Sequence, residues 1–265
     1  MNSSYQEKIK KASQLIKNST YAVAFTGAGI STESGIPDFR SPGGLWQRFR
    51  IVTYQEFIYD RQAREEFWRM KKELIHQLIN AKPNNAHIVL AELEKMGIIK
   101  HVITQNIDGL HQMAGSKSVI ELHGNQRGAI CLDCEKLYKM DEILKMFAEQ
   151  KLDLRCYNCG GVIKPTVVFF GEPLPEKELI MAQQIANQCD LMLVVGTSLQ
   201  VEPAASIPRI AYQRGSKLIF INKAETDWDW IAEIVFYGSA GQVLKDIAIE
   251  LSSHSLDEQS YLFKD

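Results

Sequence analysis

The chain has 265 residues, of which 45% are hydrophobic, so it can form one large domain with a sizeable core and a smaller second domain. Its charges nearly cancel, with 30 basic and 32 acidic residues, and this balance argues against specific binding to nucleic acid or to a membrane surface. No stretch approaches the roughly 18 apolar residues of a membrane span, and the lysine-containing N-terminus lacks the apolar segment of a secretion signal.

Strands and helices are predicted to alternate along most of the chain. Apolar residues at Tyr5, Ile9, Ala12 and Ile16 indicate an amphipathic first helix, and a short apolar strand follows at 21–25. Further helices are predicted at 83–97, 176–188, 204–212 and 242–251. Further strands are predicted at 101–104, 119–122, 167–170, 191–195 and 218–222.

Continuous apolar strands that alternate with helices favour an α/β fold with a Rossmann-like parallel sheet covered by helices on both faces. We expect residues 1–40, 83–124 and 164–252 to form this large domain. A helical insertion at 41–82 and a cysteine-containing module at 125–163 would form the small domain. A polar tail at 253–265 is expected to be loosely ordered.

Four of the five cysteines form two Cys-x-x-Cys pairs, Cys131/Cys134 and Cys156/Cys159. Each pair can bind a cation from a tight turn, and together they supply the four tetrahedral ligands that zinc prefers. The 21 residues between the pairs, 135–155, fall just outside the usual zinc-ribbon range. Because all four ligands are protein thiolates, the site is predicted to be structural. The alternatives are disulfides or free core thiols, and reduced thiolates favour a cytoplasmic location.

A glycine-rich loop, Gly27-Ala28-Gly29, follows the first predicted strand. Such a loop lets the backbone approach a pyrophosphate closely and present N–H groups to it. Thr32 replaces the third glycine of the dinucleotide-binding pattern, so a purely structural turn is an alternative. Arg40, which follows shortly after, could contact phosphate through two N–H groups, although a single arginine is more often a solvated surface charge.

Polar residues follow the ends of the other predicted strands, where α/β sheets bind their ligands. These residues are Gln105-Asn106-Ile107-Asp108, His123, Gly196-Thr197-Ser198 and Asn222. A histidine in this position is suited to proton transfer because its pKa lies near the working pH, although a single histidine there often has a structural role. Since these strand ends converge on one edge, the sequence predicts a ligand site there.

Together, these motifs resemble the sirtuins, which are NAD-dependent protein-lysine deacylases, along nearly the whole chain. The matching stretches, in the order of the family, are 27–31, 35–40, 104–111, 122–124, the four paired cysteines, 168–172, 196–199 and 201–203.

The resemblance implies that the large domain binds NAD and that the cysteines bind one structural Zn²⁺. His123 would be the general base acting on the ribose hydroxyls, and Asn106 would orient the ribose or a water molecule. Asp108 would bind the nicotinamide carboxamide. The expected NAD contacts are Gly27, Ala28, Gly29, Thr32, Phe39, Arg40, Gln105, Asn106, Ile107, Asp108, His123, Gly196, Thr197, Ser198, Asn222, Lys223 and Ala240.

An acyl-lysine peptide would add as a strand between two segments of the chain, a mode of binding that depends mainly on the backbone. The peptide contacts implied by the resemblance are Val168, Phe170, Gly171, Glu172 and Val201. Nicotinamide would leave as the acyl oxygen attacks the ribose, and His123 would then help the 2′-hydroxyl to attack. The products would be free lysine and O-acyl-ADP-ribose, and zinc would take no part.

Other functions are less consistent with the sequence. An NAD hydrolase or ADP-ribosyltransferase could use the same pocket, but the complete peptide-binding motifs argue against both. A dehydrogenase usually lacks a four-cysteine zinc module beside such a loop, and a zinc-ribbon nucleic-acid module would carry a basic face. A monomer or weak oligomer is expected, with acyl-lysine proteins or peptides as partners and with no specific nucleic acid and no membrane.

The expected acyl group is neutral. Relatives that prefer succinyl or malonyl groups bind the acyl carboxylate with a Tyr-x-x-Arg pair, and this chain has Trp68 and Lys71 at the corresponding positions. Trp68 has no hydroxyl group, and Lys71 lacks the planar fork of arginine, so acetyl-lysine is expected to be preferred.

Overall fold

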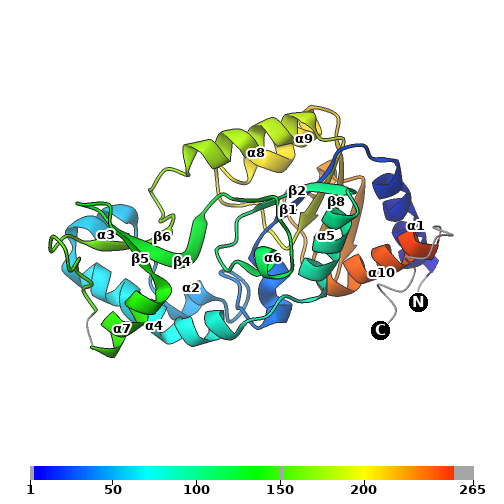
Figure 1. Ribbon diagram of the computed structural model, residues 1–265. Helices are drawn as coiled ribbons and strands as arrows, with labels where there is room; N and C mark the ends of the chain where they lie inside the picture. Colours follow the sequence, from blue (N-terminus) through cyan, green and yellow to red (C-terminus); the bar gives the residue numbers. More distant parts are fainter. Residues whose placement is uncertain (1–2, 150–151, 254–265) are drawn as a thin grey trace.

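The computed structural model describes residues 3–149 and 152–253 and shows a parallel sheet at one end and a smaller sheet at the other (Figure 1). The large sheet has six parallel strands in the order β3-β2-β1-β7-β8-β9. They are β1 Ala22–Thr26, β2 Ile99–Thr104, β3 Val119–Glu121, β7 Leu191–Val195, β8 Lys217–Asn222 and β9 Ile234–Tyr237. Every residue of β1 and β7 is buried, as expected for strands covered on both faces.

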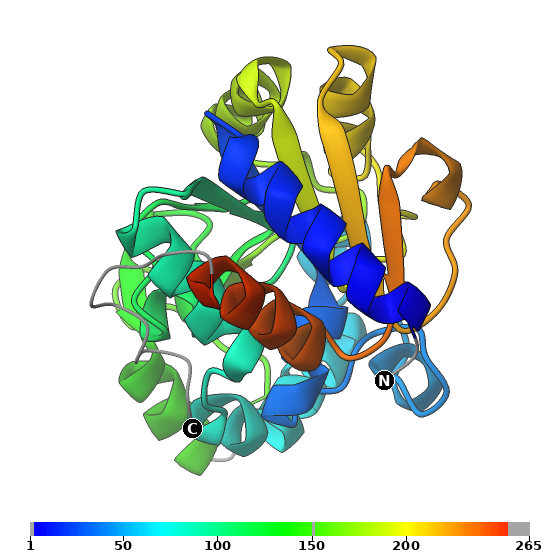
Figure 2. The same ribbon diagram turned by 90° about the vertical axis from the view of Figure 1, so that its right-hand side faces the viewer.

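Helices pack on both faces of this sheet because successive strand residues point to opposite sides. Ala22 and Ala24 contact one apolar core with α1 Ser3–Asn18, α5 Asn85–Lys95 and α10 Ala240–Ser253. Figure 2 shows α1 and α10 lying across this face. Val23 and Phe25 belong to the opposite core, which includes α8 Glu176–Gln188 and α9 Ser206–Gln213. The predicted α/β architecture is therefore confirmed.

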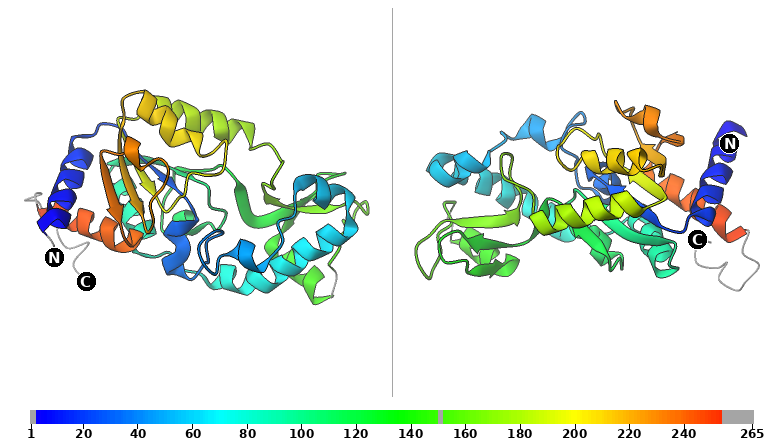
Figure 3. Two further views of the ribbon diagram at one scale, coloured as in Figure 1. Left: turned by 180° about the vertical axis from the view of Figure 1, so that it is seen from behind. Right: turned by 90° about the horizontal axis from the view of Figure 1, so that it is seen from above.

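The smaller sheet is antiparallel, in the order β5-β4-β6, and lies at the opposite end of the molecule from α1 and α10 (Figure 3). Its strands are β4 Gly124–Cys131, β5 Leu137–Lys139 and β6 Ile163–Val167. The helices on this side are α2 Leu45–Arg48, α3 Tyr54–Tyr59, α4 Arg61–Asn80 and α7 Met140–Ala148. Phe57 and Trp68 share one apolar core with Tyr138 and Phe147, so the two insertions pack together.

Short helices in the described ranges complete the fold. The glycine loop continues into a 3₁₀ helix, η1 Ala28–Ser34, and the polar segment after β2 leads into α6 Leu110–Met113. A second 3₁₀ helix, η2 Asp229–Ile231, precedes β9. None of the helices in the described ranges is long and apolar enough to cross a membrane.

Three expectations need correction. The strand predicted at 167–170 is instead β6, which ends at Val167 and pairs antiparallel with β4, so residues 164–167 lie in the small sheet rather than in the large domain. The edge strand β9 was not predicted because it has only four residues, of which two are buried. Ser253, which was expected in the polar tail at 253–265, is instead the last residue of α10, and the rest of that expectation, at 254–265, lies outside the described residues.

Candidate active site

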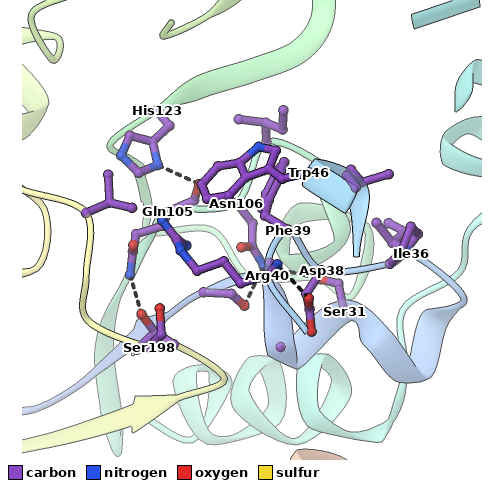
Figure 4. A pocket seen from close by; sticks show the side chains of 18 of the residues that line it. Ser31, Ile36, Asp38, Phe39, Arg40, Trp46, Gln105, Asn106, His123 and Ser198 are labelled. Atoms are coloured by element: carbon purple, nitrogen blue, oxygen red, sulfur yellow. Dashed lines mark hydrogen bonds between the residues drawn. The ribbon is translucent and has the colours of Figure 1, made fainter. Parts of the chain in front are cut away.

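A cavity of about 580 Å³ lies at the carboxyl ends of β1, β2, β7 and β8, between the two sheets. All the residues predicted to contact NAD or peptide line it, including the glycine loop, the segment after β2, His123 and the segment after β6. Figure 4 shows His123, Gln105 and Asn106 facing the same space as Phe39, Arg40 and Ser198. The fold therefore brings the predicted residues together, and their individual roles stay predictions.

The glycine loop is held against the end of β7 by close backbone contacts. The N–H of Gly27 donates to the carbonyl of Val195 at 3.0 Å, and the N–H of Gly29 donates to that of Gly196 at 2.8 Å. A Cβ on Gly29 would lie 2.8 Å from the Gly196 Cα atom, and one on Gly196 would lie 2.2 Å from the Ile30 nitrogen. Because these two N–H groups bind protein carbonyls, the glycines serve first to pack two strand ends together rather than to present N–H groups to phosphate.

A polar network forms the floor of the cavity. The Asn106 amide nitrogen donates to the Gly27 carbonyl at 3.1 Å and lies 3.2 Å from the Ser31 hydroxyl. The Ser31 hydroxyl in turn donates to the Asp108 carboxylate at 2.7 Å. Burial raises the pKa of Asp108 above its ordinary value, although hydrogen bonds from Leu110 and Ser31 oppose this effect. These contacts fix the orientation of the Asn106 amide and the Asp108 carboxyl group beside one another.

His123 has a defined tautomer. Its Nδ1 atom lies 2.9 Å from the backbone carbonyl of Gln105, and a carbonyl can only accept a hydrogen bond, so Nδ1 carries the proton. Nε2 therefore keeps its lone pair. Burial lowers the pKa of His123 below its ordinary value, while the contact with Gln105 acts in the opposite direction. The imidazole is consequently neutral at pH 7, the state that a general base requires.

Cationic side chains also line the cavity. The Lys223 ammonium donates to the Thr32 hydroxyl at 3.3 Å, next to the glycine loop. The Asn222 side-chain oxygen accepts from the N–H of Thr197 at 2.9 Å, which fixes the loop after β7. Arg40 also lines the cavity, so Arg40 and Lys223 can both supply positive charge to an anionic ligand.

The segment after β6 is held by a largely buried ion pair that was not predicted. The Lys164 ammonium, 7% exposed, lies 3.0 Å from the Glu172 carboxylate and donates to the Val167 carbonyl at 2.7 Å. The second Glu172 oxygen accepts from the N–H of Phe169 at 2.9 Å. Lys164 therefore closes the loop at 167–172 and fixes the shape of the predicted peptide-binding edge.

The acyl-binding positions differ from expectation. Trp68 is 2% exposed and packs in the small-domain core against Phe57, Phe67 and Phe147, and it does not line the cavity. Lys71 does line the cavity, but it is buried, and its ammonium donates to the Gln126 side-chain oxygen at 2.5 Å. Burial lowers the pKa of Lys71 to about 7. The amine is thus fixed rather than mobile, and it is partly neutral at physiological pH.

The four paired cysteines form a cluster that fits a zinc ion. The Sγ atoms of Cys131 and Cys159 are 3.4 Å apart, those of Cys134 and Cys156 are 3.6 Å apart, and all four lie within 4.8 Å of one another. Tetrahedral zinc with Zn–S bonds of about 2.3 Å requires sulfur atoms about 3.8 Å apart. These separations are far longer than a disulfide bond, which is about 2.05 Å long. The tight turns, together with Gly161, whose Cβ would lie 2.9 Å from the Cys131 sulfur, hold the thiols in place.

Comparisons with known proteins support one family throughout the chain. Residues 27–203 match the family described as the Sir2 family. An NAD-dependent protein deacetylase of Thermodesulfovibrio yellowstonii is 79% identical over 247 residues, which cover 93% of this chain and 96% of that protein. NAD-dependent protein deacylase 2 of Archaeoglobus fulgidus is 44% identical over 93% of this chain and 97% of that protein.

Solved structures agree with the sequence comparison. A structure described as a Sir2–p53 peptide–NAD⁺ complex superimposes with a TM-score of 0.85 at 42% identity, covering 93% of this chain and 99% of that one. A structure of Sir2Tm bound to a propionylated peptide gives a TM-score of 0.84 at 43% identity, covering 94% of this chain and 100% of that one.

Proposed function

The chain belongs to the Sir2 family, and we propose that it deacylates lysine side chains of proteins in an NAD-dependent reaction, with acetyl-lysine as its preferred substrate. The products are nicotinamide, O-acyl-ADP-ribose and free lysine. The observation that carries the proposal is the neutral His123, whose Nε2 lone pair is available for a proton beside Asn106.

His123 acts as the base toward a ribose hydroxyl. Its Nδ1–H is bound to the Gln105 carbonyl, so the ring is held in the tautomer that accepts a proton at Nε2. The positive charge that then forms is partly stabilised by the same carbonyl oxygen. Bound NAD supplies a ribose carbon from which nicotinamide can leave.

The remaining residues bind and orient the two substrates. Asn106 and Asp108 are held side by side through Ser31, which suits recognition of the nicotinamide amide and the ribose. Arg40 and Lys223 supply positive charge for the diphosphate. The loop closed by Lys164 and the segment at 199–201 supply the two edges between which the peptide adds as a strand.

Cys131, Cys134, Cys156 and Cys159 would hold the structural Zn²⁺, which stabilises the small domain and leaves no ligand position for substrate. The balanced charge supports the absence of a specific nucleic-acid partner. We also propose a cytoplasmic monomer or weak oligomer; reduced zinc thiolates support the location.

Incubation with NAD and a panel of acyl-lysine peptides, followed by mass spectrometry, tests the proposal. We expect deacylated peptide, nicotinamide and O-acyl-ADP-ribose in equal amounts. Nicotinamide release that does not depend on the peptide would instead indicate an NAD hydrolase, and protein that carries added ADP-ribose would indicate a transferase. Either result, without deacylated peptide, would contradict the proposed function.

A further inference from the structure

The segment at 38–46 folds back on itself, and this geometry places Trp46 beside Arg40. The Asp38 carboxylate accepts hydrogen bonds from the N–H groups of Arg40 at 3.0 Å and Ser41 at 2.7 Å. The N–H of Trp46 donates to the Phe39 carbonyl at 3.2 Å. This reversal of the chain requires glycine at position 44, because a Cβ on Gly44 would lie 2.8 Å from the Phe39 carbonyl carbon.

One side of the Trp46 ring contacts residues predicted to bind NAD. The Arg40 guanidinium carbon lies 4.2 Å from the Trp46 ring centroid, a cation–π contact, and the Phe39 ring centroid is 5.4 Å away. Figure 4 shows Trp46 beside Phe39 and Arg40 at the cavity. A diphosphate that binds Arg40 therefore acts on a side chain whose position depends on this ring.

Trp46 also contacts the predicted peptide edge. Its ring packs edge-on against Phe170, with centroids 5.3 Å apart and an interplanar angle of 64°. The Phe170 carbonyl accepts a hydrogen bond from the N–H of Tyr54 at 2.9 Å, so the position of Phe170 is fixed from the small domain. Phe170 is 42% exposed and is available to a peptide that adds beside it.

We propose that Trp46 is a positioning residue that couples NAD binding to acyl-lysine peptide binding, because one indole ring contacts both Arg40 and Phe170. The inference rests on the proposed function. Either ligand fixes the ring, so the second ligand pays less ordering entropy when it binds. The coupling is reciprocal, and each ligand tightens the binding of the other by the same factor.

ADP-ribose tests the coupling without turnover, because it has the diphosphate and both riboses but no nicotinamide to release. Its dissociation constant is measured by calorimetry with and without a saturating acetyl-lysine peptide. We expect the peptide to tighten ADP-ribose binding to the wild type by at least about fivefold, within the range typical of coupled sites. Trp46→Leu should reduce this factor below about twofold.

Trp230→Leu is the matched control, because Trp230 is 68% exposed and does not line the cavity. In this control variant, the peptide should tighten ADP-ribose binding by the same factor as in the wild type. A tryptophan fluorescence change on ADP-ribose binding should likewise persist in this control and disappear in Trp46→Leu, a signature that a merely structural role would not produce. Should Trp46→Leu fold poorly, Trp46→Phe decides the question: the smaller ring should lower the factor at least about twofold, since tryptophan is the best cation–π partner.

A wild-type factor near one, or an unchanged factor in the folded Trp46 variants, would overturn the proposal. Deacylation by the wild type is measured in parallel. If it is absent, the proposed function fails; if deacylation is intact and the coupling is unaffected by Trp46, only the role of Trp46 fails.

Discussion

Lys71 should make the acyl preference depend on pH. A succinyl group brings a carboxylate into the cavity, and burying this charge without a partner is costly. Lys71 is a buried basic residue that lines the cavity, so it could serve as this partner. Only its ammonium form can pair with the carboxylate. With a pKa of about 7, the amine is mostly neutral at pH 8 and mostly charged at pH 6.

The magnitude follows from this pKa. About one tenth of a group with a pKa of 7 is protonated at pH 8 and about nine tenths at pH 6, so the competent fraction rises roughly tenfold. The succinyl carboxylate, like that of glutamate with a pKa of about 4.3, stays ionised throughout. At pH 8 we expect kcat/KM for acetyl-lysine to exceed that for succinyl-lysine by at least about tenfold, about 1.4 kcal/mol in the barrier.

The assay measures kcat/KM for matched acetyl and succinyl peptides between pH 6 and pH 8 by mass spectrometry. The ratio of the two values cancels the titration of His123, which both reactions share, and kcat/KM reports the free enzyme. The succinyl/acetyl ratio should rise about tenfold toward pH 6 in the wild type. It should be flat and low in Lys71→Met, and flat and higher in Lys71→Arg. A flat wild-type ratio, or a preference for succinyl-lysine at pH 8, would refute this account of Lys71.

Three further outcomes are expected. His123→Ala should lower the deacylation rate by about 10²–10⁴-fold while calorimetry still detects NAD binding, and wild-type turnover in this variant would exclude His123 as the base. Because the pKa of His123 is lowered, kcat/KM of the wild type should fall only as the pH drops below about 6.5. Cys156→Ser should lose zinc and lower Tm together, since structural zinc binding is coupled to folding; a variant with full zinc content and a normal Tm would contradict a four-thiolate site. Lys164→Met leaves Glu172 without its buried partner and should raise the peptide KM more than the NAD KM, whereas the exposed Lys95→Met should change neither; equal changes in both KM values would speak against a role at the peptide edge.

The sequence predicted the large sheet well because its strands carry continuous apolar runs. Leu191–Val195 is apolar at every position and is buried throughout. The same reasoning misplaced the strand at 167–170, because an apolar run does not distinguish a strand from a loop whose side chains line a cavity. These residues instead form a loop held by Lys164, whose ion-pair partner Glu172 lies eight positions further along the chain.

Much of the candidate site could be predicted because its residues follow strand ends in the sequence, where parallel sheets bind ligands. Contacts between segments that are distant in the sequence could not be predicted in this way. Nothing local to Lys71 indicates that Gln126, 55 positions away, fixes its ammonium, and nothing local to Trp46 indicates contact with Phe170. Such pairs depend on how the two insertions pack, which periodicity does not describe.

Within the described residues, 3–149 and 152–253, the chain passes between the two sheets four times, and three of these crossings carry cavity residues. The first crossing contains Arg40, the third contains His123 between β3 and β4, and the fourth contains Phe170 after β6. Atoms close to a hinge axis move least when two lobes rotate. A rotation of the two sheets relative to one another about these crossings would therefore displace the outer ends of the molecule far more than His123.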